Sequence, residues 1–265
     1  MSKTYPQFLL FGDSIIQQSS YLRDGYSFGA ILAEHCIRRF DVVNRGLSGY
    51  NTANAMVILQ DIIPPPNYAK VAFMLILFGA NDACLPDSPS SQHVPLEMYR
   101  QNIKDILTHP AINAHNPTIF LVTPPPINEM QIWDGDHAKG YPTITRRQSV
   151  TAQYADAVRQ IATESKNDKL VLIDLHSAMM QKAITLTPGY VEGASLLGTL
   201  QGGDSVALKT LFNEKRNPYM LFLAVDGLHL TGAGYKVFIE ELLPHIQTPP
   251  FIFPVWTDAP RIDRE

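Results

Sequence analysis

The feature of this sequence that most constrains its fold is an alternation, almost from end to end, between short apolar runs and longer amphipathic stretches. Each apolar run is continuous and is closed by glycine, asparagine, aspartate or proline. Continuous runs, unlike alternating ones, are typical of strands that are covered on both faces. We therefore predict strands at residues 8–12, 41–44, 71–79, 118–123 and 169–174.

Between these runs the apolar residues recur with the period of an α-helix. The clearest case starts at Tyr235, where the spacing i, i+3, i+4, i+7, i+8, i+11 continues to Ile246. Comparable apolar faces lie within 28–36, 96–107 and 150–161. Strands that alternate with amphipathic helices form a mainly parallel sheet with helices on both sides. The sequence thus predicts an α/β fold, specifically a three-layer α/β/α sandwich with a mainly parallel sheet.

The length of 265 residues suits one domain with a large core, and we predict a single domain over 1–265. Two stretches, at about 127–145 and 184–222, interrupt the alternation with glycine, proline and mixed periodicity. We interpret both as excursions of the chain over the functional site. A proline-rich, aromatic tail starts at about 247, and we expect it either to pack along the body or to reach a second subunit.

The composition excludes several classes of partner. The net charge is −4 and the basic residues are scattered singly, so the chain has no positive surface for nucleic acid. Cys36 and Cys84 lie in apolar surroundings, which is typical of free buried thiols in a reducing compartment. Neither a signal peptide nor an apolar run long enough to span a membrane is evident. We therefore expect a cytoplasmic protein with a small-molecule partner, no nucleic acid and no membrane span.

The polar residues that follow the predicted strands point to a site, because parallel sheets bind ligands at the carboxyl ends of their strands. Ser14 follows the first strand directly, and a serine hydroxyl becomes a good nucleophile when a base removes its proton. His229 is the best candidate base, since Asp226 lies three residues before it in a turn and can orient the imidazole. Taken alone, the D-x-x-H pattern is also typical of a cap or turn.

Acyl transfer also needs donors for the oxyanion of the tetrahedral intermediate. Gly49 in "NRGLSGYNT" offers its backbone, and Asn81 in "FGAND" offers a side-chain amide. Together with the backbone N–H of Ser14, these residues provide three donors from three strand ends. We therefore predict an oxyanion hole formed by Ser14, Gly49 and Asn81.

The four motifs together resemble a known family. GDS at 12–14, the glycine of "NRGLSGYNT", "GAND" at 79–82 and DxxH at 226–229 match, in order and spacing, the four blocks of the SGNH hydrolases, also called the GDSL esterase/lipase family. The resemblance implies a flavodoxin-like fold and serine ester hydrolysis. It also implies the roles of the matching residues: Ser14 as nucleophile, Gly49 and Asn81 as oxyanion donors, His229 as base and Asp226 as orienting acid.

Within that family the chain is most similar to the isoamyl acetate-hydrolysing esterases. The similarity lies in "LFGDSI", "LFGANDAC", "TPPPINE" and "DGLHL". It implies acetate esters of small alcohols as substrates, no metal or other cofactor, and a homodimer as one arrangement of the subunits. Other esters stay open as alternatives with the same chemistry, namely carbohydrate O-acetyl esters, lysophospholipids and thioesters.

Two further alternatives belong to other functional classes. The chain is a non-catalytic binding protein if it keeps the fold without the activity, since fold alone does not guarantee function. It is a metal hydrolase if Asp13, Asp82, Asp226 and His229 bind a divalent ion. We interpret Asp13 and Asp82 more simply, as acceptors that hold their turns by binding backbone N–H groups.

Several other residues have two interpretations each. Asp174 and His176 form a competing acid–histidine pair, although a structural histidine at the start of an apolar helix explains the same pattern. Met130, Trp133 and Tyr141 lie in the first excursion. They either line an acyl or alcohol pocket or pack against the core.

Overall fold

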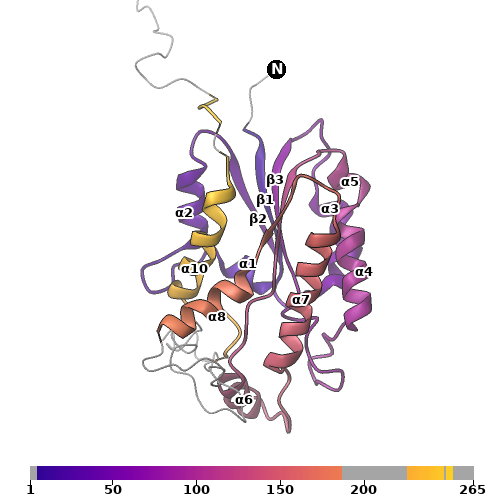
Figure 1. Cartoon of the computed structure of the whole chain (residues 1–265), viewed down its shortest axis with the longest axis vertical. Coiled ribbons are helices and arrows are strands. Elements are labelled where there is room, and N and C mark those ends of the chain that lie inside the picture. The colour runs from indigo at the N-terminus through magenta and orange to yellow at the C-terminus, as the bar shows by residue number, and fades with distance from the viewer. Residues whose placement is uncertain (1–4, 187–225, 248, 253–265) are drawn as a thin grey trace, which may run out of the picture.

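The computed structural model describes residues 5–186, 226–247 and 249–252 (Figure 1). Within these ranges five strands form one sheet in the order β2-β1-β3-β4-β5, and every neighbouring pair is parallel. The α/β prediction is therefore confirmed, and each expected run is a strand. The strands are β1 (Gln7–Gly12), β2 (Asp41–Gly46), β3 (Val71–Leu77), β4 (Thr118–Val122) and β5 (Leu170–Ile173).

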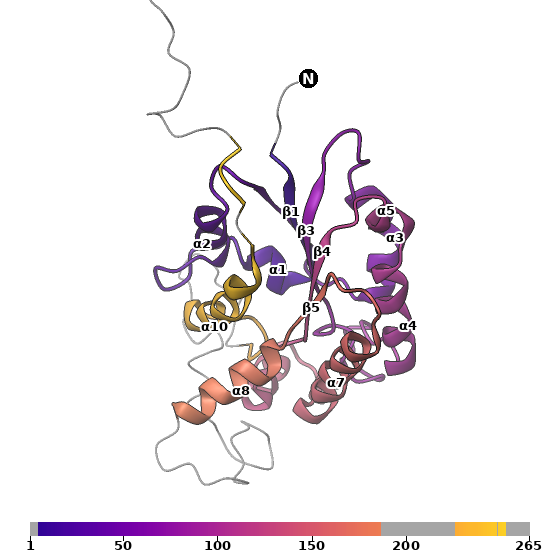
Figure 2. The same ribbon diagram turned by 45° about the horizontal axis from the view of Figure 1, so that its top comes forward.

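Helices cover both faces of the sheet, which gives the three layers expected from the sequence (Figure 2). One layer contains α1 (Ser14–Gln18), α2 (Phe28–His35), α8 (Leu175–Thr185) and α10 (Gly232–Leu242). The other contains α3 (Thr52–Ile62), α4 (Leu96–Leu107), α5 (Pro110–Asn113) and α7 (Gln148–Glu164). Two more helical elements are α6 (Glu129–Ala138) and the 3-10 turn η1 (Leu243–His245).

The side chains of β1 show how the two layers share the sheet. Phe8 and Leu10 pack into the cluster that includes α2, α8 and α10, whereas Leu9 and Phe11 pack into the cluster that includes α3, α4 and α7. All four side chains are buried. Because successive strand residues point to opposite faces, a strand buried on both sides has to be apolar at every position.

Aromatic rings of the central strands pack against one another on one face of the sheet. The Phe8 ring lies 5.3 Å from that of Phe73 and 5.6 Å from that of Phe120, measured between centroids. Phe73 and Phe120 are also 5.6 Å apart. Such pairs contribute about 0.5–1.5 kcal/mol each beyond the area that they bury. They hold β1, β3 and β4 in one register, which fixes the relative positions of the strand ends.

The order of the strands determines where a ligand can bind. The chain moves outward in one direction from β1 to β2 and in the other from β3 to β5, so the order reverses between β1 and β3. In open parallel sheets the crevice at this reversal, beyond the carboxyl ends of the strands, is the usual ligand site. Ser14 follows β1 and Asn81 follows β3, so both lie at this crevice.

The predicted excursions and tail are described in part. The first excursion contains α6, and the second lies outside the described residues from 187 onward. The described tail packs next to α2: Nε of Arg39 donates to the carbonyl of Pro249 at 2.8 Å, and the guanidinium groups of Arg38 and Arg39 lie over the ring of Phe251. The tail therefore contacts the body of the same chain over these residues.

The predictions about the two cysteines and about a membrane span can be compared with the structure. Cys36 and Cys84 are both buried and free, as expected. Burial raises the pKa of the Cys36 thiol to about 11, which keeps it protonated and unreactive. None of the helices in 5–186, 226–247 and 249–252 combines the length and the apolar character that crossing a bilayer requires.

Candidate active site

The first side chain of the site is placed by the end of β1. Asp13 follows the strand and caps α1, since its Oδ1 accepts a hydrogen bond of 2.8 Å from the backbone N–H of Ile15. Ser14 is then the first residue of the helix, and it is only 5% exposed. The first N–H groups of a helix have no partner inside it, so the N–H of Ser14 is available to a ligand.

The second element of the site is the turn before α10. His229 Nε2 lies 2.8 Å from Ser14 Oγ, and His229 Nδ1 lies 2.5 Å from Asp226 Oδ2. The other oxygen of Asp226 accepts two backbone N–H groups, those of Leu228 and His229, at 3.0 Å each. The structure thus brings together the serine, the histidine and the aspartate that the sequence predicts.

The charge of Asp226 determines where the imidazole proton lies. Burial raises the pKa of this carboxyl, but the neighbouring His229 and the hydrogen bonds that it accepts outweigh burial and leave the pKa below its ordinary value. An ionised carboxylate can only accept, so Nδ1 of His229 carries the proton. Nε2 is then free to accept from the hydroxyl of Ser14.

Gly49 lies in a tight turn after β2. The N–H of Tyr50 donates to the carbonyl of Leu47 at 3.1 Å, and Gly49 is the third residue of this turn with a φ of +83°. A positive φ at this position favours glycine, because a Cβ atom would strain the backbone. The carbonyl of Gly49 accepts from Nε2 of Gln92 at 2.9 Å, which fixes the turn.

Asn81 is 3% exposed and its amide is held from both ends. Its Nδ2 donates to the carbonyl of Tyr50 at 2.9 Å, and its Oδ1 accepts from Nη2 of Arg146 at 3.0 Å. A side-chain amide has two N–H donors, so one remains for a ligand. Together with Ser14, Gly49 and His229, Asn81 lines one pocket of about 320 Å³.

Most of the other side chains that line this pocket are polar. They are Gln18, Ser48, Ser90, Gln92, Asp136, Lys139, Tyr141, Thr145 and Arg146, with Leu228 as the apolar member. Four of them come from the first excursion, namely Asp136, Lys139, Tyr141 and Thr145, so this stretch contributes to the wall of the pocket. Trp133 is not among the lining residues. Its ring lies 3.9 Å from that of His137, and it packs against the core.

The two acidic residues beside the motifs act as acceptors, as we interpret them from the sequence. Asp13 holds α1, and Asp82 Oδ1 accepts from the N–H and the hydroxyl of Thr52, at 2.9 and 2.5 Å, and so holds the start of α3. Burial raises the pKa of Asp13 to about 7 and that of Asp82 to about 6. Both residues are fully buried.

The competing acid–histidine pair is not formed. Asp174 accepts two hydrogen bonds of 2.8 Å from the guanidinium of Arg159 and is engaged there. His176 is buried beside Thr123, whose hydroxyl accepts from the His176 backbone, and burial lowers the pKa of the His176 imidazole to about 4. The interpretation of His176 as a structural residue is the one that agrees with these contacts.

The carboxylate of Asp226, one member of the metal alternative, already has other partners. Both oxygens of Asp226 are engaged, by His229 and by backbone N–H groups. Across the described ranges, no group of three or more histidine, cysteine, aspartate or glutamate side chains has an arrangement that suits a metal ion.

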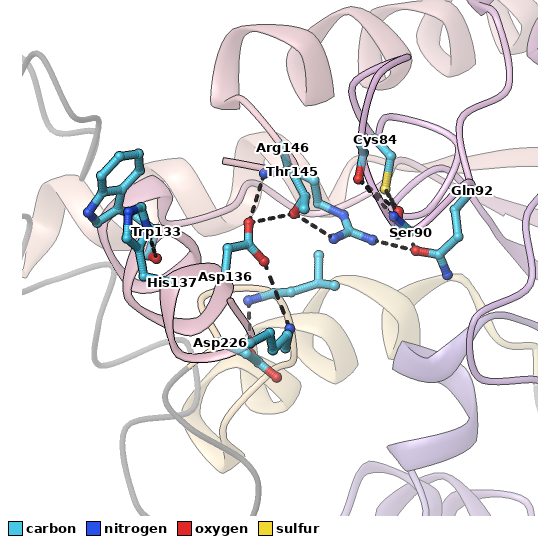
Figure 3. A network of polar contacts seen from close by, with 12 residues as sticks. Cys84, Ser90, Gln92, Trp133, Asp136, His137, Thr145, Arg146 and Asp226 are labelled. Atoms are coloured by element: carbon cyan, nitrogen blue, oxygen red, sulfur yellow. Dashed lines mark hydrogen bonds and ion pairs between the residues drawn. The ribbon is translucent and has the colours of Figure 1, made fainter. Parts of the chain in front are cut away.

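Among the lining residues that the sequence does not single out, Gln92 and Arg146 contact the predicted oxyanion donors. Figure 3 shows the Arg146 guanidinium between Gln92 and Thr145, with Asp136 on the far side of Thr145. Each contacts residues more than forty positions away, such as Gly49 for Gln92 and Asn81 for Arg146. No local pattern marks them, so only the three-dimensional structure could identify them.

Comparison with known proteins tests the resemblance. The model of the GDSL-like lipase/acylhydrolase family matches residues 10–237. The isoamyl acetate-hydrolyzing esterase 1 homolog of Mus musculus is 30% identical over 261 residues, which are 96% of this chain and 88% of that protein. The isoamyl acetate-hydrolyzing esterase of Saccharomyces cerevisiae is 29% identical over 254 residues, which are 92% of this chain and 87% of the yeast protein.

A solved structure shows the same fold at low sequence identity. The crystal structure of the acetyl xylan esterase AlAXEase is 15% identical, and the alignment covers 91% of this chain and 100% of that one with a TM-score of 0.61. The family match runs from β1 into α10 and includes all four motifs. The chain therefore belongs to the GDSL-like lipase/acylhydrolase family and is a carboxylic ester hydrolase, as its motifs predict.

Proposed function

We propose that this chain hydrolyses short-chain carboxylic esters, with acetate esters of small alcohols preferred, through an acyl-enzyme on Ser14. The observation that carries the proposal is the hydrogen-bonded series from Asp226 through His229 to Ser14, with distances of 2.5 and 2.8 Å. The order and spacing of these contacts are those that an activated serine requires.

In the first half of the reaction the ester is cleaved. Nε2 of His229 takes the proton of the Ser14 hydroxyl while Oγ attacks the carbonyl carbon of the ester. The resulting imidazolium, stabilised by the carboxylate of Asp226, then gives its proton to the departing alcohol. Ser14 is left as an ester of the acyl group.

In the second half water replaces the serine as nucleophile. His229 takes a proton from a water molecule, which attacks the acyl carbon, and then returns that proton to Oγ of Ser14. The acid is released and the enzyme is restored. In both halves the tetrahedral oxyanion is stabilised by the N–H groups of Ser14 and Gly49 and by the free amide hydrogen of Asn81.

The size of the pocket and the similarity to known esterases support small substrates. A cavity of about 320 Å³ lies at the small end of the usual range for ligand pockets. The mouse and yeast relatives both have names that state hydrolysis of isoamyl acetate, and they are similar to this chain over most of its length. A short acyl group and a small alcohol fit both observations.

A panel of p-nitrophenyl esters tests the proposal. Initial rates on acetate, butyrate, octanoate and palmitate are measured for the wild type and for Ser14→Ala, with and without EDTA. We expect activity that depends on Ser14, resists the chelator and falls as the acyl chain lengthens. Rates that rise toward palmitate would contradict the substrate size, and loss of activity in EDTA would point to a metal hydrolase.

Labelling separates catalysis from a binding role. An organophosphate that reacts with activated serines is expected to modify the wild type at one site, Ser14, and to leave Ser14→Ala unlabelled. If the wild type is neither labelled nor active on any ester while remaining folded by circular dichroism, the chain is a binding protein on an esterase fold.

The polar lining of the pocket favours a second candidate, an esterase whose alcohol product carries hydroxyl groups. Gln18, Ser48 and Tyr141 present hydrogen-bonding groups beside Ser14, whereas an isoamyl group has none to offer. Acetylated sugars would use these groups. Comparing kcat/KM for isoamyl acetate and for an acetylated xylose decides between the candidates. The ester whose alcohol part makes more contacts with the pocket in the transition state has the higher kcat/KM.

A further inference from the structure

A buried arginine, Arg146, lines the pocket beside Asn81. Arg146 lies between α6 and α7, and only 8% of it is exposed. An arginine remains charged in a protein, so burying it is costly unless its donors are satisfied. The acceptors of its hydrogen bonds therefore indicate its role.

Two of its hydrogen bonds go to Ala80 and Asn81, which follow β3, and a third goes to Gln92. Nε donates to the carbonyl of Ala80 at 2.8 Å, and Nη2 donates to Oδ1 of Asn81 at 3.0 Å and to Oε1 of Gln92 at 3.2 Å. A longer bond of 3.4 Å joins Nη1 to the hydroxyl of Thr145 (Figure 3). All four acceptors are neutral oxygens.

The contact with Asn81 determines which way that amide faces. A guanidinium has donors only, so it can bind the amide oxygen of Asn81 and not the nitrogen. The nitrogen is therefore turned away from Arg146, toward the carbonyl of Tyr50 and the pocket. Arg146 and the carbonyl of Tyr50 together oppose a rotation of the amide by half a turn, which would present an oxygen to the oxyanion.

The contact with Gln92 links Arg146 to the turn of Gly49, the second predicted oxyanion donor. Oε1 of Gln92 accepts from Arg146, so its Nε2 is left to donate to the carbonyl of Gly49, at 2.9 Å. One guanidinium thus holds Asn81 directly and the turn of Gly49 through a single intervening side chain. The two donors come from different strands, and Arg146 connects them.

The charge of Arg146 adds to this geometric effect. Within the described ranges Arg146 forms no ion pair, and its hydrogen bonds go to neutral oxygens. A charged donor on the oxygen of an amide draws electron density from its nitrogen and makes the remaining N–H a stronger donor. A buried positive charge beside the pocket also favours a transition state that carries negative charge.

We propose that Arg146 is a positioning residue for the oxyanion hole: it orients and polarises the amide of Asn81 and, through Gln92, fixes the turn of Gly49. The inference rests on the proposed function, in which Asn81 and Gly49 bind the oxyanion. Arg146 itself does not contact the reacting atoms. Its contribution belongs to the transition state and not to the binding of the ester.

Steady-state kinetics on p-nitrophenyl acetate are measured for Arg146→Lys and Arg146→Met, with Arg147→Met as the matched control. Arg147 is the neighbouring arginine, and its side chain is half exposed and bonded to Glu129. We expect kcat of Arg146→Met to fall roughly 10- to 100-fold with KM changed by less than about threefold. Arg146→Lys is expected to be intermediate, and Arg147→Met to match the wild type.

Three further measurements exclude a merely structural role. Active sites are counted by complete organophosphate labelling, so that kcat refers to folded enzyme. The affinity for an alkyl trifluoromethyl ketone, whose adduct with Ser14 carries an oxyanion, is expected to fall in Arg146→Met by about the same factor as kcat/KM. Added guanidinium ion is expected to raise the rate of Arg146→Ala but not that of Arg147→Ala. Normal kcat per labelled site, or unchanged affinity for the ketone, would overturn the inference.

A double-mutant cycle separates failure of this inference from failure of the proposed function. If Arg146 acts through Asn81, the variant that combines Asn81→Ala with Arg146→Met loses clearly less activity than the product of the two single losses. If the two losses multiply, Arg146 does not act through Asn81 and the inference fails. If Asn81→Ala alone keeps the wild-type kcat, the assigned oxyanion hole is wrong and the proposed function has to be revised first.

Discussion

Asp226 and His229 are joined twice, once through their side chains and once through the backbone. Oδ2 of the carboxylate binds Nδ1 of the imidazole at 2.5 Å, while Oδ1 accepts the backbone N–H of His229 at 3.0 Å. The second contact holds the carboxylate in place independently of the imidazole. Asp226 is therefore suited to fix both the position of the ring and its tautomer.

The first prediction concerns that tautomer. Asp226→Asn keeps the size of the side chain, but its amide can donate to Nδ1 and so place the imidazole proton on Nε2, where it cannot accept from Ser14. We expect kcat on p-nitrophenyl acetate to fall by on the order of 10⁴ with little change in the melting temperature. A loss smaller than tenfold, measured at equal concentrations of folded protein, would mean that His229 is oriented by other contacts.

The second prediction concerns the oxyanion. Asn81→Ala removes one donor, and the expected loss in kcat is on the order of 10²–10³. Asn81→Asp has almost the same shape but places a carboxylate where negative charge develops, so its loss should exceed that of Asn81→Ala. If the two variants are equally active, the amide of Asn81 does not face the oxyanion.

The third prediction concerns the close approach of β2 to α1. A Cβ atom added at Gly46 would lie 2.0 Å from the backbone nitrogen of Gln17, so Gly46→Ala has to move the helix that begins with Ser14. We expect a loss of about 1–3 kcal/mol in the free energy of unfolding together with a lower kcat.

Gly25→Ala serves as the control for Gly46→Ala. Gly25 has a φ of +78°, but no atom lies within 4 Å of an added Cβ, so only backbone strain of about 1–2 kcal/mol is expected. Its kcat should match the wild type. A normal kcat for Gly46→Ala would show that α1 adjusts without moving Ser14.

The fourth prediction concerns the dependence of stability on pH. Because burial raises the pKa of Asp13 from 3.8 to about 7, the folded protein binds a proton that the unfolded chain has already lost between these values. The free energy of unfolding therefore falls as pH rises through this range, and the decrease ends above about pH 7. Asp13→Asn retains an oxygen for the Ile15 N–H and cannot ionise, so this part of the decrease disappears.

Urea denaturation between about pH 5 and pH 8 measures the effect, which we expect to be on the order of a few kcal/mol. Asp61→Asn, at an exposed position in α3, should keep the wild-type dependence. If Asp13→Asn also keeps it, the decrease does not originate at Asp13.

The fold was largely predictable because its strands carry a strong local signal. A strand covered on both faces, such as β3, is apolar at every position and is easy to recognise. The helix α3, in contrast, has no clear amphipathic pattern in the sequence. Met56, Val57 and Ile58 are adjacent, and Val57 is 81% exposed, so the apolar residues of this segment do not lie on one face.

The site was predictable where its chemistry is local or belongs to a motif. Asp226 and His229 share one turn, and Ser14 lies at the end of the first strand. The supporting contacts could not be predicted, because the bond from Asp82 to Thr52 spans 30 positions and the one from Arg146 to Asn81 spans 65. The single domain, the homodimer and the cytoplasmic location remain predictions.

The distance along the chain between Ser14 and His229, 215 positions, has a consequence for biosynthesis. A ribosome adds about 5–20 residues per second, so roughly 10–40 s pass between the synthesis of Ser14 and that of His229. During this time the nascent chain can carry Ser14, Gly49 and Asn81 but has no histidine to activate the serine. Under the proposed mechanism, hydrolysis begins only after the turn that carries Asp226 and His229 has been made and has docked, so newly synthesised chains would not cleave esters before they have folded.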